Sequence, residues 1–222
     1  WIFHAAWSPD GERLAIAGVD EEEGGVVRIV DRSGEDVAVL RDEAGVAPKS
    51  VSFSADGTRL LTARSSIERA DPSLTAVHIW DWEAEEIIDT FPIPADRAVF
   101  DPTGTRIVAT LSTSFGAGVW DAESGRRLAT LSGHRSPVFD VTFSPDGTTV
   151  ASAGQDGTVR LWSATTGAQL VVMRGHTGPA ETVAFSPDGA RLVSAGPDGT
   201  ARVWAVDLDD LIEIATGRLT RT

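Results

Sequence analysis

The chain has 222 residues, no cysteine and a formal net charge of −14 at pH 7. The lack of cysteine excludes disulfides, thiolate nucleophiles and zinc-thiolate sites within these residues. The acidic charge would repel a phosphate backbone, and the basic residues are scattered singly, so we expect neither nucleic acid nor an anionic membrane as partner. A basic or neutral protein surface fits this charge better.

A four-residue turn motif recurs five times along the chain, at intervals of 42 to 47 residues. A fixed period of about 40 to 45 residues is typical of a four-stranded propeller blade. Short alternating apolar runs such as Val141-Thr142-Phe143 lie on either side of the turns and predict β-strands rather than helices. The five copies are Ser8-Pro9-Asp10-Gly11, Ser54-Ala55-Asp56-Gly57, Asp101-Pro102-Thr103-Gly104, Ser144-Pro145-Asp146-Gly147 and Ser186-Pro187-Asp188-Gly189.

A second landmark follows each turn, near the end of a later strand. Its copies are Val30-Asp31, Trp80-Asp81, Trp120-Asp121, Trp162-Ser163 and Trp204-Ala205. The two landmarks divide residues 1–206 into one domain of five units, at about 1–44, 45–93, 94–132, 133–174 and 175–206. In the fourth unit we predict strands over 137–143, 149–153, 158–162 and 168–173, and the other units align on it.

The last unit lacks an outer strand in this alignment. Residues 207–222 carry apolar residues at helical spacing, with acidic residues in the first turn. This pattern predicts a short C-terminal helix.

The last two units have nearly the same sequence. Each has Gly-His ahead of it (Gly133-His134 and Gly175-His176), Asp-Gly-Thr in the middle, and a tryptophan at the end. In these features the chain resembles the WD-repeat family of β-propellers, and the resemblance is looser in the first three units. It implies an all-β propeller of four-stranded antiparallel blades that serves as a non-catalytic protein-interaction scaffold or sensor.

The chain begins with an inner strand, whereas rings of this family are closed by an N-terminal segment that supplies the outer strand of the last blade. We therefore interpret the sequence as the C-terminal part of a larger propeller, with further blades expected upstream or with self-association. The alternative is a complete five-bladed ring with a degenerate final blade.

One group of polar residues has the composition of a hydrolytic triad and occurs twice. Catalysis needs such a group once, and the resemblance implies instead a structural hydrogen-bond network that ends on the blade tryptophan, with no catalytic residues. The members are His134, Ser152, Asp156 and Trp162 in the fourth unit and His176, Ser194, Asp198 and Trp204 in the fifth.

The acidic run Asp20-Glu21-Glu22-Glu23 has the ligand chemistry of a calcium site. We favour a solvated hairpin tip, because metal-binding loops alternate ligands with glycine or spacer residues. We therefore predict no metal and no cofactor.

A long hairpin from Arg64 to Thr75 in the second unit suggests a recognition site, because extra loop length on a rigid scaffold often carries binding. A tolerated surface insertion is the alternative. Hairpins between second and third strands share one side of a propeller with the loops that enter each blade. The predicted partner-binding residues on that side are Arg64, Arg69, Arg135, Gln155 and Pro197.

The composition, with Lys49 as the single lysine and abundant alanine, arginine and glycine, resembles that of proteins from GC-rich bacteria. We predict a cytoplasmic module of a larger bacterial signalling protein. The alternative is a propeller attached to a hydrolase or peptidase, or a periplasmic ligand-binding propeller. The sequence upstream of this chain would distinguish them.

Overall fold

The computed structural model describes residues 1–20, 24–41, 45–64 and 75–206. These residues form nineteen strands in five antiparallel sheets, without a helix. The predicted all-β blade architecture is confirmed. The helix predicted over 207–222 lies outside the described residues, and within them no helix is long and apolar enough to span a bilayer.

Each sheet is a simple antiparallel meander, and the five sheets follow the five units predicted from the sequence. The strands are β1 Ile2–Trp7, β2 Arg13–Asp20, β3 Gly24–Asp31 and β4 Asp36–Leu40; β5 Ser50–Phe53, β6 Arg59–Arg64, β7 Ala76–Asp81 and β8 Glu86–Phe91; β9 Ala98–Phe100, β10 Arg106–Leu111, β11 Gly116–Asp121 and β12 Arg127–Ser132; β13 Val138–Phe143, β14 Thr149–Gly154, β15 Thr158–Ser163 and β16 Gln169–Arg174; β17 Thr182–Phe185, β18 Arg191–Ala195 and β19 Ala201–Ala205.

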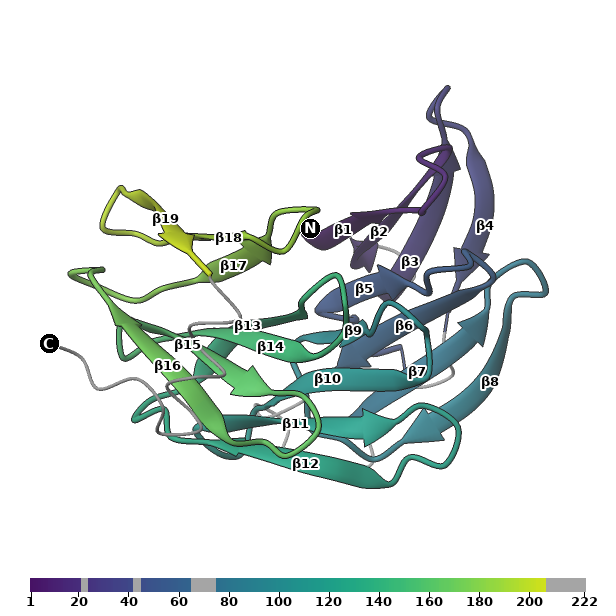
Figure 1. The fold of residues 1–222 in the computed structure, drawn as a ribbon. Coiled ribbons are helices and arrows are strands. Elements are labelled where there is room, and N and C mark those ends of the chain that lie inside the picture. The colour runs from purple at the N-terminus through teal and green to yellow at the C-terminus, as the bar shows by residue number, and fades with distance from the viewer. Residues whose placement is uncertain (21–23, 42–44, 65–74, 207–222) are drawn as a thin grey trace, which may run out of the picture.

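The sheets follow one another around an arc, with the first strand of each sheet on the inside (Figure 1). The purple β1–β4 sheet and the yellow β17–β19 sheet form the two ends of this arc. The inner strands β1, β5, β9, β13 and β17 pack in that order. The five inner strands therefore lie around a common central axis.

The apolar core lies between successive sheets rather than within any one of them. Leu61 and Ile79 of the second sheet pack with Ile107 of the third in one buried cluster. Val108 of the third sheet belongs to the next cluster, together with Val141 of the fourth. Both faces of a middle sheet are therefore buried, which explains why its strands are apolar on both sides.

The repeated turn motif joins each inner strand to the second strand of its sheet. In the second sheet Ser54 Oγ donates to Asp56 Oδ1 over 2.5 Å, and the amide of Gly57 donates to the carbonyl of Ser54 over 2.9 Å. Gly57 has a φ of 74°, a conformation that glycine adopts without strain. The hydrogen bond from Ser54 lowers the pKa of Asp56, so this acceptor stays ionised at neutral pH.

Arginines at the start of two second strands link neighbouring sheets. Arg59 lies over the Phe100 ring, 5.1 Å from its centroid, and its Nη2 donates to the carbonyl of Gly104 over 2.8 Å. In the next sheet Arg106 lies 5.3 Å from the Phe143 centroid and donates to the carbonyl of Gly147 over 2.7 Å. Each arginine thus joins its own sheet to the end of the inner strand in the following sheet. We call this contact the arginine clamp.

The two end sheets expose apolar residues that middle sheets bury. On β1, Trp7 is 61% exposed, whereas the phenylalanines at the same repeat position of the middle sheets, Phe53, Phe100 and Phe143, are buried. On the last sheet Val193 and Val203 face each other across β18 and β19, and Val203 is 63% exposed. In the fourth sheet the equivalent pair, Ala151 and Leu161, is buried against the fifth sheet.

The arginine clamp predicts a measurable stability difference between two arginines at one repeat position. Arg106→Ala should lower the free energy of unfolding by about 1 to 3 kcal/mol, because it removes the bond to Gly147 and an Nε donor to the buried carboxylate of Asp101. Arg191→Ala is the matched control. Arg191 begins β18, is exposed and makes no side-chain hydrogen bond with the described residues, so the change should be within about 0.5 kcal/mol. Denaturant midpoints of the two variants check this, and equal losses would contradict it.

Candidate functional site

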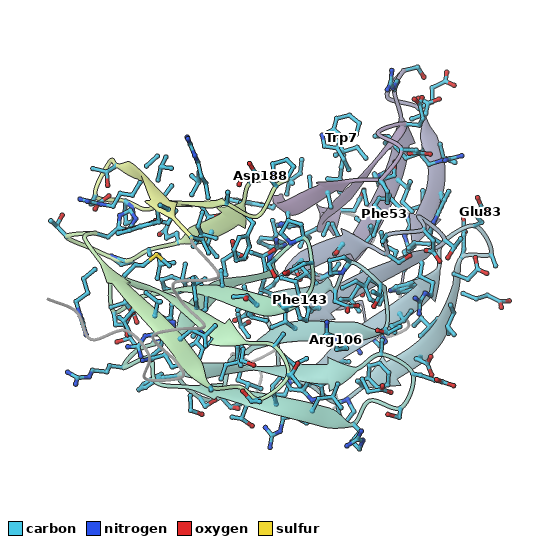
Figure 2. All side chains as sticks on the ribbon, in the orientation of Figure 1. Trp7, Phe53, Glu83, Arg106, Phe143 and Asp188 are labelled. Atoms are coloured by element: carbon cyan, nitrogen blue, oxygen red, sulfur yellow. The ribbon has the colours of Figure 1, made fainter. Side chains whose placement is uncertain are left out.

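The sheet topology gives the molecule two faces. We call the loop face the side that holds the loops leading into the inner strands and the hairpins between second and third strands. The turn face is the opposite side, where the inner strands end in the repeated turns. Phe53 and Phe143, labelled in Figure 2, end β5 and β13 there and line a hollow of about 350 Å³. Of the residues that we predicted to bind a partner, Arg135, Gln155 and Pro197 lie on the loop face.

On the loop face the structure brings together the four polar residues of the fourth unit. His134 Nε2 lies 2.8 Å from Ser152 Oγ, and the indole Nε1 of Trp162 donates to the same Oγ over 2.8 Å. His134 Nδ1 lies 3.0 Å from Asp156 Oδ1. The network therefore runs from the loop before β13, through β14 and the β14–β15 hairpin, to β15.

The network assigns one proton arrangement. An ionised Asp156 can only accept, so Nδ1 of His134 carries a proton, Nε2 accepts from the Ser152 hydroxyl, and Ser152 accepts from Trp162. Burial lowers the pKa of His134 against the opposing effect of Asp156, which favours this neutral tautomer. Burial opposes ionisation of Asp156, but hydrogen bonds from Thr158, the Arg135 amide and His134 hold the pKa of its carboxyl well below its usual range.

The fifth sheet repeats the same geometry. His176 Nδ1 lies 2.9 Å from Asp198 Oδ2, and His176 Nε2 lies 2.8 Å from Ser194 Oγ. Trp204 Nε1 donates to Ser194 over 2.9 Å. A hydrogen bond from Thr200 is the largest effect holding the pKa of the Asp198 carboxyl below its usual range.

The second and third sheets keep only parts of this network. Trp80 Nε1 donates to Thr62 Oγ1 over 3.0 Å in the second sheet. In the third sheet the hydroxyl of Thr110 accepts instead from the main-chain amide of Arg97, over 3.2 Å. These sheets depend more on apolar packing, in which Trp80 and Trp120 are both buried.

The serine of each complete network is inaccessible to a substrate. Ser152 and Ser194 are both 0% exposed, and each hydroxyl oxygen already accepts from an indole. A nucleophilic hydroxyl oxygen needs a reacting carbonyl within about 3 to 3.5 Å. A serine with no exposed surface leaves no space for a substrate carbonyl at that distance. The geometry supports a structural role for both networks.

A second polar system lies at the centre of the loop face. One residue in each inner strand, or just before it, stands three positions ahead of the aromatic residue that ends the strand. These residues are His4, Ser50, Arg97, Asp140 and Thr182. Because they share one repeat position, they lie at one level around the axis, and we call them the polar ring.

Hydrogen bonds connect the polar ring across the sheets. Arg97 Nε donates to Asp140 Oδ1 over 2.8 Å, and its Nη1 contacts the ring nitrogen Nε2 of His4. Asp140 Oδ2 accepts from Thr182 Oγ1 over 3.0 Å and from the Val183 amide over 2.9 Å. The Asp140 carboxylate thus links the third, fourth and fifth sheets. The contact of Arg97 with His4 links the first sheet to them.

Four residues of the polar ring, His4, Arg97, Asp140 and Thr182, line a hollow of about 400 Å³ that opens on the loop face. Lys49 and Asp96 form an ion pair of 2.9 Å at its rim, and Phe3 and Phe139 add exposed aromatic surface. The sequence analysis did not predict this site. The shared spacing before the aromatic residue is the signal that would have found it.

The predicted partner-binding residues divide into three groups. Arg135, Gln155 and Pro197 are exposed on the loop face. The amide of Arg135 donates to Asp156 over 2.9 Å, so its backbone is fixed while its side chain faces solvent. Arg64 requires a correction: it is only 6% exposed, because β6 extends through it in pairing with Ala76. Arg69 lies outside the described residues.

The acidic run of the first unit is described only in part. Asp20 forms an ion pair of 3.1 Å with Arg28 across β2 and β3, so its carboxylate already has a partner within the protein. Residues 21–23 lie outside the described residues.

Comparison with known proteins identifies the repeats. The model of the family described as WD domain, G-beta repeat matches residues 125–163 and 167–205. Those residues cover the end of the third unit and most of the last two, where the motifs are most regular.

Curated relatives are similar to the chain in sequence. The chain is 34% identical over 117 residues to WD repeat and HMG-box DNA-binding protein 1 of Xenopus laevis, covering 52% of the chain and 10% of the relative. It is 32% identical over 159 residues to Periodic tryptophan protein 2 of Arabidopsis thaliana, covering 70% and 16%. It is 26% identical over 155 residues to Eukaryotic translation initiation factor 3 subunit I of Culex quinquefasciatus, covering 63% and 44%. The chain spans less than half the length of each.

The His134 network predicts a loss of stability on truncation. His134→Ala should lower the free energy of unfolding by about 1 to 3 kcal/mol, because it removes the acceptor of the buried Ser152 hydroxyl and one of the donors to Asp156. Arg135→Ala, which removes a neighbouring exposed side chain and keeps the amide bond to Asp156, is the control and should be nearly neutral. Chemical denaturation measures both. An unchanged midpoint for His134→Ala would argue against the structural role.

The polar ring predicts a pH-dependent stability. Burial, followed by the charge of Arg97, lowers the pKa of His4 from 6.5 to about 4. The unfolded chain then binds a proton more readily than the native one, so stability should fall as the pH drops from about 6.5 toward 4. His4→Gln should reduce this slope, whereas Ser50→Ala, which alters the same ring without removing a titrating group, should keep it. Denaturation at a series of pH values tests this, and identical slopes in all three proteins would contradict it.

Proposed function

We propose that this chain, as a WD-repeat propeller protein, is a non-catalytic scaffold that binds a protein partner on its loop face. The observation that carries the proposal is that exposed side chains on the loop face are held in place by buried hydrogen-bond networks. Arg135, Gln155 and Pro197 face solvent, while the buried His134 and His176 networks hold the loops and hairpins that carry them. A rigid surface loses little entropy when it binds.

The surroundings of these residues suit a protein partner. The hollow above the polar ring offers aromatic side chains, one ion pair and hydrogen-bonding groups within a single concave surface. Interface centres are enriched in aromatic residues and arginine, and Arg135 supplies a planar head with several donors. Eukaryotic translation initiation factor 3 subunit I is, by its name, part of a complex, and a similar role here would fit this surface.

We further propose that the chain works within a larger bacterial signalling protein in the cytoplasm and contributes the C-terminal blades of its propeller. The composition rich in alanine, arginine and glycine supports a bacterial source. The exposed apolar residues on both end sheets, including Trp7 and Val203, support further blades beside them, because the middle sheets bury the same positions. The absence of a nucleic-acid partner stays a prediction from charge.

A charge reversal on the loop face tests the proposed function. Arg135→Glu should weaken binding by roughly thirtyfold, the effect of losing an interface anchor of about 2 kcal/mol. The matched control is Arg126→Glu, an equally exposed arginine in the β11–β12 turn on the opposite face. The partner is first captured by crosslinking in cells of the source organism, and calorimetry with the purified pair then gives the affinities.

The two variants make the outcome decisive. Thermal unfolding of both should match the wild-type protein, because neither arginine side chain is part of the buried networks. Binding that survives Arg135→Glu and is lost with Arg126→Glu would move the partner to the turn face and refute the proposal.

A further inference from the structure

A second set of residues shares one repeat position around the central hollow of the loop face. Each member stands one position ahead of a residue of the polar ring. The members are Phe3, Lys49, Asp96, Phe139 and Glu181, and all five line the hollow. We call them the rim. Four of the five are exposed, so the rim is the part of the hollow that a bound group would contact first.

Both aromatic residues of the rim lie at irregularities in their strands. Phe3 is the extra residue at a bulge in the pairing of β1 with β2, and Phe139 is the extra residue at a bulge in the pairing of β13 with β14. A β-bulge changes the direction in which a side chain points and is common beside functional sites. The two rings are 51% and 39% exposed, so part of each is available to a ligand.

The charged groups of the hollow are paired, with one exception. Lys49 forms an ion pair of 2.9 Å with Asp96, and Arg97 forms one of 2.8 Å with Asp140. Glu181 is the fifth charged residue. Its side chain is exposed and forms no ion pair or hydrogen bond with the residues that the structure describes. The hollow therefore has an excess of one negative charge, and that charge lies on Glu181.

Phe139 and Glu181 are held on neighbouring inner strands. β13 and β17 pack against each other, and the residues that follow the two rim positions are joined, because Asp140 Oδ2 accepts from Thr182 Oγ1 over 3.0 Å. The main-chain amide of Glu181 also donates to the carbonyl of Ala195 over 2.9 Å. The backbone is thus fixed at a point where an aromatic ring and a carboxylate face the same hollow.

This combination favours a cation. The face of an aromatic ring attracts a positive charge, and a carboxylate binds it through charge-assisted hydrogen bonds. A guanidinium suits both groups, because its plane stacks on a ring while its forked donors match a carboxylate.

An anionic ligand fits the hollow less well. Both cations of the hollow already have carboxylate partners. Burial, followed by the charge of Arg97, lowers the pKa of His4 to about 4, so His4 adds no positive charge at neutral pH. The net charge of −14 also favours a basic segment as it approaches.

We propose that the central hollow of the loop face binds an arginine side chain of the protein partner, with its guanidinium stacked on Phe139 and paired with the Glu181 carboxylate. This inference rests on the proposed function, because it assigns the chemistry of the partner at the surface proposed there. The arginine would belong to a basic segment that lies across the rim.

A short peptide with a single arginine tests the assignment without the native partner. The probe is Gly-Gly-Arg-Gly-Gly with acetyl and amide caps, titrated into the ¹⁵N-labelled 222-residue chain and followed by two-dimensional NMR. Saturable shifts are expected at the amides of Glu181 and Thr182. The same peptide with citrulline, a neutral residue of nearly the same shape, should bind about tenfold more weakly. Equal affinities, or no saturable shift at the rim, would overturn the proposal.

A lysine peptide tests the choice of arginine. It should bind more weakly than the arginine peptide, because an ammonium group has no plane to stack on a ring and no fork to match a carboxylate. Tighter binding of the lysine peptide would overturn the assignment to arginine.

Variants of the protein locate the two contacts. Glu181→Gln should bind the arginine and citrulline peptides equally. The matched control is Glu123→Gln, an exposed glutamate in the β11–β12 turn on the turn face, which should keep the preference for arginine. Phe139→Leu should weaken the arginine peptide about two- to fivefold, the effect of losing a cation–π contact at an exposed site. A preference for arginine that survives Glu181→Gln would overturn the proposal.

The captured partner separates this inference from the proposed function. Its binding should weaken with both Arg135→Glu and Glu181→Gln. A loss with Arg135→Glu alone would leave the proposed function standing and overturn the arginine site. Binding of the arginine peptide at the rim, together with a partner that depends on Arg126, would overturn the proposed function and retain the site.

The oligomeric state tests whether a second copy of the chain is the occupant. Light scattering coupled to gel filtration should give the same mass for the wild-type chain and for Glu181→Gln. A dimer that Glu181→Gln converts to a monomer would place an arginine of a second copy in the hollow and overturn the assignment to a different protein.

Discussion

Each sheet in this chain is stable because a neighbouring sheet covers its face, and this requirement determines most of the structure. A four-stranded sheet has two faces and little interior of its own, so the apolar clusters form only between successive sheets. The middle sheets satisfy the requirement on both sides. The end sheets satisfy it on one side, which leaves Trp7 and Val203 exposed.

Polar contacts fix the geometry that apolar packing alone would leave loose. Near the turn face, Arg59 and Arg106 each bind a carbonyl of the next sheet and cover its aromatic ring. At the centre of the loop face, Asp140 joins three sheets through Arg97, Thr182 and the backbone of the fifth. Hydrogen bonds depend on direction in a way that apolar contacts do not, so these contacts set the angle between sheets.

Repeats made the fold predictable from the sequence. The five turn motifs and the later landmarks, Val30 and four tryptophans, predicted the five sheets and their strands. The residues of the His134 and His176 networks were also identified, because the last two units match each other almost residue for residue. In both cases the signal is local and recurs, so one copy supports the other.

The polar ring and the burial of Arg64 could not be inferred in the same way. His4, Arg97 and Asp140 differ in chemistry, and only the superposition of the units shows that they share one position. Arg64 looked like the start of a surface hairpin, yet β6 includes it. Whether an arginine at the end of a strand is buried depends on the neighbouring sheet, and that information is not local.

The repeat position therefore supplies an internal comparison for each side chain. Arg106 and Arg191 begin equivalent strands, but within the described residues only Arg106 has a following sheet to bind. Arg160 and Arg202 likewise stand at one position, and only Arg160 meets an acceptor on a fourth strand. The residue type and backbone are the same within each pair, so the difference lies in the neighbour. A contact that forms in one sheet and not in another thus separates what a side chain contributes by itself from what its neighbour contributes.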